Sequence, residues 1–149
     1  MRPTDPEPFT LGRFPVFIFK GAGDFDAFYG MPSALGLGVK VARHGGPKTD
    51  PDRPDREVAD SDREPVRAFL KAYLPDLADS PLDQTEVCLY TMAQDEQFKV
   101  GCLAGRNDVI VASPCSGHGF KFSCLIGSIL ADLALTGETA HDVAAWRFA

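Results

Sequence analysis

Apolar and polar residues follow one another in the first part of the chain in a pattern typical of short β-strands. Residues 15–19 and 26–31 are aromatic or β-branched runs, with Gly-bearing turns after each at 20–24 and 32–38. In residues 39–44, apolar positions alternate with polar or small ones, which indicates a strand with one wet face. Three such strands in succession predict an antiparallel meander.

A polar loop then precedes an amphipathic helix. Residues 45–57 consist almost wholly of Gly, Pro and polar residues, which argues against regular structure. Ser61 and Glu64 fit a capping box, so the helix is expected to begin near Asp60 or Ser61. The apolar residues that follow recur at helical spacing and form one stripe: Val66, Phe69, Leu70, Tyr73 and Leu74. Pro75 is expected to end this helix.

The last part of the chain predicts strands followed by an apolar helix. Strand-like runs occupy residues 86–92, 98–100 and 108–112. A turn is expected at 106–108, between the second and third of these runs. The helix is expected from about Phe120 to Leu135, with Gly137 as its C-terminal cap. The whole pattern predicts an α+β (mixed α/β) fold.

Composition and charge narrow the classes of protein. A chain of 149 residues, 44% of them hydrophobic, fits one domain or two small lobes and is too apolar for general disorder. The net charge of −6 argues against nucleic acid or anionic lipid as a partner, and no apolar run approaches the roughly 20 residues of a membrane span. The first residues lack a secretory signal, so a cytoplasmic protein with reduced cysteines is expected. No metal site is expected, because Cys115, His118 and Cys124 supply too few ligands.

The junction at residues 109–122 is the most informative segment for chemistry. It reads as a strand, a Gly-bearing loop and the start of a helix, where free backbone amides and the helix dipole favour an anion. Lys121 lies in the expected first helical turn, where a cation is unfavourable unless an anionic partner is present. The segment therefore indicates either a site for a phosphate, a carboxylate or an electron-rich ring, or a tight turn with a solvated lysine.

Two further groups of residues also have alternative interpretations. Cys88 and Tyr90 would share one face of the expected strand, where a cysteine is commonly a small buried hydrophobe. Lys40, Ala42 and His44 would share one face of another strand. That face is either a solvent edge or one wall of a polar pocket.

Four segments of the chain together carry a family resemblance. They are Cys88-Leu89-Tyr90-Thr91, Asp95-Glu96-x-Phe98, Ser116-Gly117-His118-Gly119-Phe120-Lys121-Phe122, and the run from Ile126 to Asp142. These segments resemble the C-terminal portion of the monomeric sarcosine oxidase and N-methyl-tryptophan oxidase family, flavin-dependent amine oxidases of the D-amino-acid-oxidase type. Residues 28–33, 39–44 and 58–74 resemble the substrate-lobe strands and helix of that family.

The resemblance implies a domain arrangement. Residues 1–82 would be a substrate-lobe segment of antiparallel strands with a helix, after a disordered lead-in over about residues 1–12. Residues 83–149 would be strands and the C-terminal helix of the FAD-binding domain. The N-terminal Rossmann unit of the family, with its Gly-x-Gly-x-x-Gly motif, is missing from the sequence.

The resemblance also implies roles for individual residues. FAD would be the cofactor, held through a thioether by Cys88 and contacted by Gly117, His118, Gly119 and Lys121. The substrate pocket would be lined by Tyr29, Tyr90 and Lys121, with Lys121 binding the substrate carboxylate. Catalytic roles would fall to Lys40, near the flavin N5 where oxygen is activated, and to the pocket residue His44.

The implied reaction oxidises a secondary amine of an amino acid with O2 to an imine and H2O2. The expected partners are an amino-acid-like amine and either a Rossmann-bearing chain or a second copy. The sequence departs from the family at residues 112–115, Ala-Ser-Pro-Cys in place of Gly-Ala-Gly-Phe, and at residues 101–104, Gly-Cys-Leu-Ala in place of Asp-Arg-His-Pro. The alternatives are a truncated, non-catalytic relative that acts as a binding or interaction module, and a small-molecule-binding domain without flavin.

Overall fold

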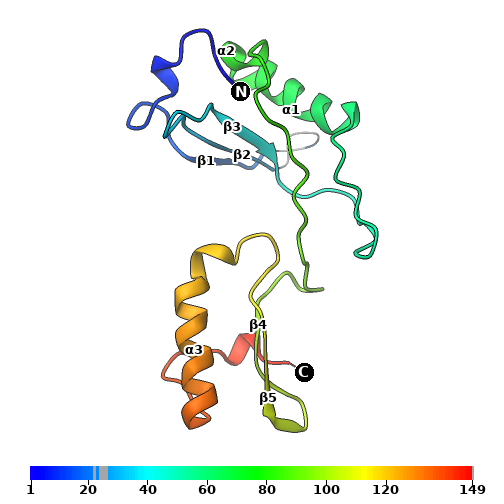
Figure 1. Cartoon of the computed structure of the whole chain (residues 1–149), viewed down its shortest axis with the longest axis vertical. Helices are drawn as coiled ribbons and strands as arrows, with labels where there is room; N and C mark the ends of the chain where they lie inside the picture. The colour runs from blue at the N-terminus through cyan, green and yellow to red at the C-terminus, as the bar shows by residue number, and fades with distance from the viewer. Residues whose placement is uncertain (22, 24–26, 149) are drawn as a thin grey trace. The chain divides into compact units, whose positions relative to one another are not determined.

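The chain forms two compact units, Met1–Cys88 and Leu89–Ala149 (Figure 1). The structure is a computed structural model, and it describes residues 1–21, 23 and 27–148. The units divide at Cys88, whereas the sequence placed the boundary at residues 82/83. Each unit combines an antiparallel sheet with a long helix, so the fold class is mixed α and β. Among the described residues, no helix has both the length and the apolar character required to cross a bilayer.

The sheet of the first unit is the expected antiparallel meander. Its strands are β1 (Phe17–Phe19), β2 (Phe28–Met31) and β3 (Lys40–Arg43), in the order β1-β2-β3. The expected second strand began at residue 26, which lies outside the described residues. The register places Tyr29 of β2 between Ile18 of β1 and Ala42 of β3. Because side chains alternate across a strand, Tyr29 and its neighbour Phe28 point to opposite faces of the sheet.

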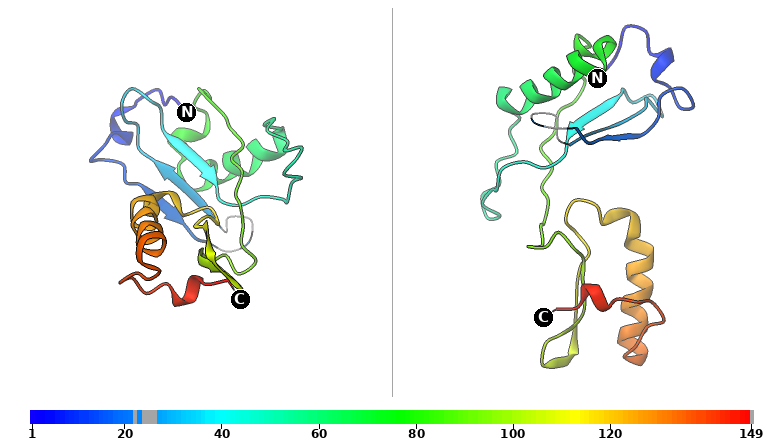
Figure 2. Two further views of the ribbon diagram at one scale, coloured as in Figure 1. Left: turned by 60° about the horizontal axis from the view of Figure 1, so that its bottom comes forward. Right: turned by 180° about the vertical axis from the view of Figure 1, so that it is seen from behind.

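Helix α1 (Asp60–Tyr73) covers one face of this sheet (Figure 2). Its apolar stripe packs on the strands through aromatic rings, because Phe69 stacks on Phe28 with ring centroids 4.4 Å apart and an interplanar angle of 3°. Tyr73, one turn further along, contacts Phe19 with ring centroids 4.4 Å apart. Pro75 ends α1 as expected and begins the short helix α2 (Pro75–Ala78).

The start of α1 corrects the expected capping box. The N-cap residue is Ala59, and its backbone amide donates a hydrogen bond of 2.9 Å to the Asp62 carboxylate. The helix begins at Asp60, as expected, but Ser61 is then already inside the first turn, so the Ser61–Glu64 pairing was wrong. Asp62 takes the place that Glu64 was expected to fill.

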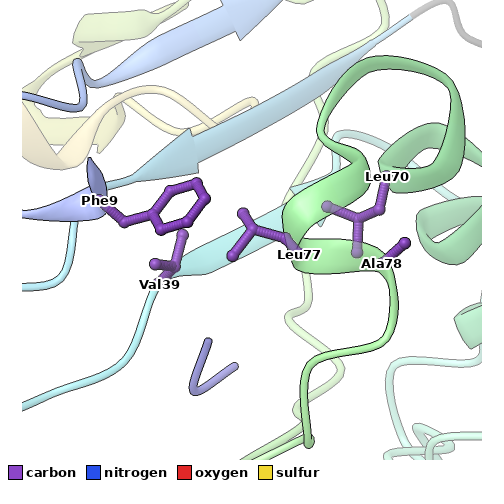
Figure 3. Close-up of a cluster of buried hydrophobic side chains, with 5 residues drawn as sticks. All are labelled: Phe9, Val39, Leu70, Leu77 and Ala78. Atoms are coloured by element: carbon purple, nitrogen blue, oxygen red, sulfur yellow. The ribbon is translucent and has the colours of Figure 1, made fainter. Parts of the chain in front are cut away.

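The expected disorder of residues 1–12 is also corrected. The segment contains a short 3-10 helix at Glu7–Phe9, and Phe9 joins a buried cluster with Val39, Leu70, Leu77 and Ala78 (Figure 3). The Met1 carbonyl accepts a 2.9 Å hydrogen bond from the Val39 amide. The charge and proline content of this segment concealed one well-placed apolar side chain, which anchors it to the core.

The second unit is a hairpin packed against a helix. Strands β4 (Lys99–Leu103) and β5 (Arg106–Ser113) are antiparallel, and helix α3 (Ser123–Thr136) follows a 3-10 turn at Phe120–Phe122. Phe98, Val100, Ile126, Ile129 and Val143 form the core. Gly137 caps α3 as predicted, in the left-handed region at φ 81°.

Two expectations for residues 83–149 were wrong. The hairpin turn lies at residues 104–105, not at 106–108, because Gly105 adopts φ 75° and leaves Arg106 to begin β5. Residues 86–92, all of which the structure describes, form no strand. The Thr91 carbonyl accepts its hydrogen bond from the loop amide of Ser116, at 2.8 Å, rather than from a neighbouring strand.

Candidate functional site

The structure brings Tyr29, Lys40 and His44 together on the sheet face opposite α1. Tyr29 pairs with Ala42 in the register, so Lys40 and His44 flank the position directly across from it. The Lys40 Nζ lies 5.3 Å from the centroid of the Tyr29 ring, and the imidazole of His44 meets that ring edge-on with centroids 6.4 Å apart. The sequence predicted that Lys40 and His44 share a face, and the sheet register adds Tyr29 to them.

The surroundings of this cluster are partly apolar. Ile18 and Met31, which share the face with Tyr29, are 73% and 44% exposed. An ammonium group beside an aromatic ring, with an apolar border, is suited to attract an electron-rich ring or a carboxylate. Lys40 and His44 are exposed as well, so this face of the first unit is an open surface of cationic, aromatic and apolar side chains.

A second group of predicted residues lies in the loop between β5 and α3. Ser116 and Gly117 adopt positive φ values of 54° and 78° in succession, and the His118 amide donates to the Cys115 carbonyl at 3.3 Å. Gly119 has an ordinary φ of −78°, yet a Cβ atom there would overlap the carbonyl oxygen of Pro114. The loop therefore closes on itself so tightly that only glycine fits at position 119.

Lys121 is bound to this loop rather than extended away from it. Its Nζ donates a 3.0 Å hydrogen bond to the His118 carbonyl and lies 4.9 Å from the centroid of the Phe122 ring. The imidazole of His118 stacks on Phe98 with ring centroids 5.0 Å apart. Because α3 begins only at Ser123, Lys121 lies in the 3-10 turn ahead of it, and the carbonyl partner offsets its unfavourable position near the helix N-terminus.

Cys88 and Tyr90 do not share a strand face, because the segment that carries them is not a strand. Cys88 is an exposed free thiol, so the expectation of a small buried hydrophobe is not met. Tyr90 is half-buried. An accessible thiol is the form of cysteine that can be modified or attached to a ligand.

The turn at residues 94–96, which contains Asp95 and Glu96, supports the loop, and sequence reasoning did not predict this support. The Asp95 carboxylate accepts hydrogen bonds from Lys99 Nζ at 2.6 Å and from the Gln97 amide at 3.2 Å. The Lys99 ammonium, with a smaller contribution from that amide, holds the pKa of Asp95 below its usual value. Glu96 adopts φ 58°, and its carbonyl lies 3.4 Å from His118 Nε2. An Asp side chain often accepts a hydrogen bond from the amide two residues later, which forms an Asx-turn. This preference of Asp95 is a signal in the sequence that could have identified the support.

An open hollow beside α1 is lined by residues other than those predicted for the candidate site. Charged and polar side chains line much of it: Asp60, Arg63, Glu64, Arg67 and residues 82–85. It contains none of the residues that the sequence singled out for chemistry, and its mixed charge favours no single class of ligand.

Replacing Gly119 with alanine is expected to destabilise the second unit by about 2 kcal/mol, because the new Cβ would force the Pro114 backbone to shift. The free energy of unfolding in urea, followed by circular dichroism, measures the effect. Gly127→Ala is the matched control. Gly127 lies inside α3 with no atom near its Cβ position, so alanine there should raise the free energy of unfolding by about 1 kcal/mol. Equal unfolding midpoints for Gly119→Ala and the parent chain would contradict the tight loop closure.

Comparison with known proteins gives the family. Residues 2–133 match the family described as FAD dependent oxidoreductase, and the chain therefore belongs to this family. The chain is 44% identical over 119 residues to monomeric sarcosine oxidase from Bacillus sp. (strain B-0618), covering 78% of this chain and 30% of that protein. It is 33% identical over 138 residues to peroxisomal sarcosine oxidase from Homo sapiens, covering 90% and 35%. It is 32% identical over 142 residues to N-methyl-L-tryptophan oxidase from Salmonella dublin, covering 93% and 37%.

The structure is similar to a solved amino acid oxidase. NikD, described as an unusual amino acid oxidase essential for nikkomycin biosynthesis, matches with a TM-score of 0.65 and 26% identity, over 81% of this chain and 33% of that one. The resemblance inferred from the residues is confirmed at the level of the family. The chain spans only 30% to 37% of the length of these three curated relatives.

Proposed function

We propose that this chain forms part of an FAD-dependent oxidase that oxidises a secondary amine of an amino acid with O2 to an imine and H2O2. The observation that carries the proposal is the gathering of Tyr29, Lys40 and His44 on one face of the first unit's sheet. Membership of the family supplies the cofactor class. The names of the curated relatives indicate sarcosine and N-methylated amino acids as the class of substrate.

The residues present fit the reactive end of FAD better than its nucleotide end. Cys88 offers an exposed thiol for a thioether, and Lys40 offers a positive charge beside an aromatic ring. The 149 residues contain no Gly-x-Gly-x-x-Gly motif for the pyrophosphate. We therefore propose that a Rossmann-bearing polypeptide, joined to this chain or separate from it, completes the cofactor site.

Each side chain has a defined task in this proposal. FAD, when bound, would take two electrons from the amine and pass them to O2. In the second unit, Lys121 would bind the substrate carboxylate in exchange for its present contact with the His118 carbonyl, and Tyr90 would contact the substrate. In the first unit, Tyr29 would contact the substrate from the face that bears Lys40. The fixed charge of Lys40 favours electron transfer to oxygen, because it stabilises negative charge as it develops.

A non-catalytic role is the second candidate, and one observation favours it. Pro114 stands where the family has glycine in the loop, it has no amide hydrogen to offer a ligand, and its carbonyl closes against Gly119. With its loop closed in this way, the chain would act as a binding or interaction module that does not take up flavin.

The test is complementation of the purified chain with FAD and with the part of the Bacillus sarcosine oxidase that this chain does not match. We expect acid-stable flavin absorbance, and peroxide from sarcosine, only in the complemented sample. The same Bacillus enzyme, divided at the same points and recombined, is the positive control. Colourless protein without peroxide, in a trial where that control is yellow and active, would favour the non-catalytic role.

A further inference from the structure

Ser116 is a buried polar residue in an unusual backbone conformation. It is 3% exposed and has φ 54°, which lies in the left-handed region of the backbone. Residues other than Gly, Asn and Asp seldom adopt this region. Such a conformation persists only where the surrounding structure determines it strongly. Ser116 lies at the start of the Ser-Gly-His-Gly loop, so whatever holds it also determines where that loop begins.

Two hydrogen bonds hold Ser116 to the segment that follows Tyr90. Its amide donates to the Thr91 carbonyl at 2.8 Å, and its Oγ accepts from the Ala93 amide at 3.2 Å. Glycine would adopt the same backbone conformation more readily, and it would keep the amide contact with Thr91. The only interaction among these that requires a serine is the one between Oγ and Ala93, so the hydroxyl has a role beyond the turn.

The loop transmits this anchor to Lys121. Gly117 follows Ser116 in a second left-handed conformation. The next carbonyl, that of His118, accepts the hydrogen bond from the Lys121 ammonium. The Phe98 ring stacks on the His118 imidazole and adds a second contact that holds the loop. The position of the Lys121 ammonium is therefore linked through a short, hydrogen-bonded path to the backbone next to Tyr90.

We propose that Ser116 is a positioning residue, which fixes the Ser-Gly-His-Gly loop and the Lys121 ammonium relative to Tyr90. The inference rests on the proposed function, because it makes the Ser116 hydroxyl a determinant of how the substrate carboxylate is bound. Ser116 itself touches no reacting atom. Its effect is on the affinity for the amino acid and not on the chemical step.

The experiment compares Ser116→Gly with the matched control Thr139→Val. Glycine removes the CH2OH side chain, and with it the hydroxyl, and it relieves the backbone strain, so the variant should fold. Thr139 lies in the same unit, and its Oγ1 donates to Asp132 at 2.9 Å, so valine removes a hydroxyl contact remote from the loop in sequence. In the chain alone, nuclear magnetic resonance follows amide hydrogen exchange at Ala93 and the Lys121 ammonium signal.

We expect Ser116→Gly to speed exchange at Ala93 roughly tenfold and to shift the Lys121 signal, with both unchanged in Thr139→Val. In the complemented enzyme, KM for sarcosine should rise roughly tenfold in Ser116→Gly, with kcat nearly constant. Faster exchange at Ala93 without a shift of Lys121, or an unchanged KM in an active enzyme, overturns the proposal. A complemented parent chain that produces no peroxide, in a trial where the recombined Bacillus enzyme is active, refutes the proposed oxidase instead, and the Lys121 signal in the chain alone still decides whether Ser116 positions the loop.

Discussion

Replacement of Cys88 with alanine is expected to remove all acid-stable flavin from the complemented protein. A thioether requires a sulfur atom at the attachment point, and Cys88 is the exposed thiol that the family resemblance assigns to that bond. Flavin held only by hydrogen bonds and packing leaves when acid unfolds the protein, whereas flavin held covalently remains with the chain. The measurement is flavin fluorescence of the protein band after acid precipitation and denaturing electrophoresis, and the expected change is from full signal to none.

Cys124→Ala is the matched control for that experiment. Cys124 is also an exposed free thiol, but it lies in α3 and has no assigned role, so its alanine variant should retain the whole signal. Fluorescence that survives in Cys88→Ala would assign the attachment to another residue. Flavin that binds the unaltered complemented protein but is released entirely by acid would show that the cofactor is held without a covalent bond.

The elements that the sequence predicted well are those determined by local periodicity. The meander and α1 were predicted because alternation and a 3.6-residue stripe are properties of short windows, and α1 indeed packs its stripe on the sheet. The strand expected at 86–92 was wrong for a complementary reason. Aromatic and β-branched residues favour a strand only where a partner strand is available, and Thr91 bonds to a loop amide instead.

The candidate site was predictable only in part. Alternation was sufficient to place Lys40 and His44 on one face, but the addition of Tyr29 depends on the pairing of β2 with β3, which no local pattern specifies. Ser116 was part of a recognised motif, yet its hydroxyl contact with Ala93 joins two segments far apart in the sequence. Residues whose partners are distant along the chain can be identified as chemistry-bearing from sequence, but their geometry follows only from the fold.

Replacement of Phe69 with alanine is expected to lower the free energy of unfolding of the first unit by about 3–5 kcal/mol. Phe69 is 1% exposed, and its ring contacts Phe28 at 4.4 Å, Tyr73 at 5.2 Å and Phe19 at 5.3 Å between centroids. Phe17 also stacks on Phe69, with ring centroids 6.2 Å apart, so alanine would leave a cavity where α1 meets the sheet and four rings would lose a partner at once. A loss of this size is comparable to the whole stability of a small unit, so the Tyr29, Lys40 and His44 cluster should be lost with the sheet that carries it.

Urea unfolding, together with hydrogen exchange at the amides of β2 and β3, measures this effect. Phe120→Ala removes the same side chain from a position that is 93% exposed, so its free energy of unfolding should change by less than about 0.5 kcal/mol. A loss below about 1 kcal/mol for Phe69→Ala would mean that α1 does not hold the sheet through this ring. The face that bears Lys40 would then need another support, and the assignment of α1 as the scaffold of the candidate site would be wrong.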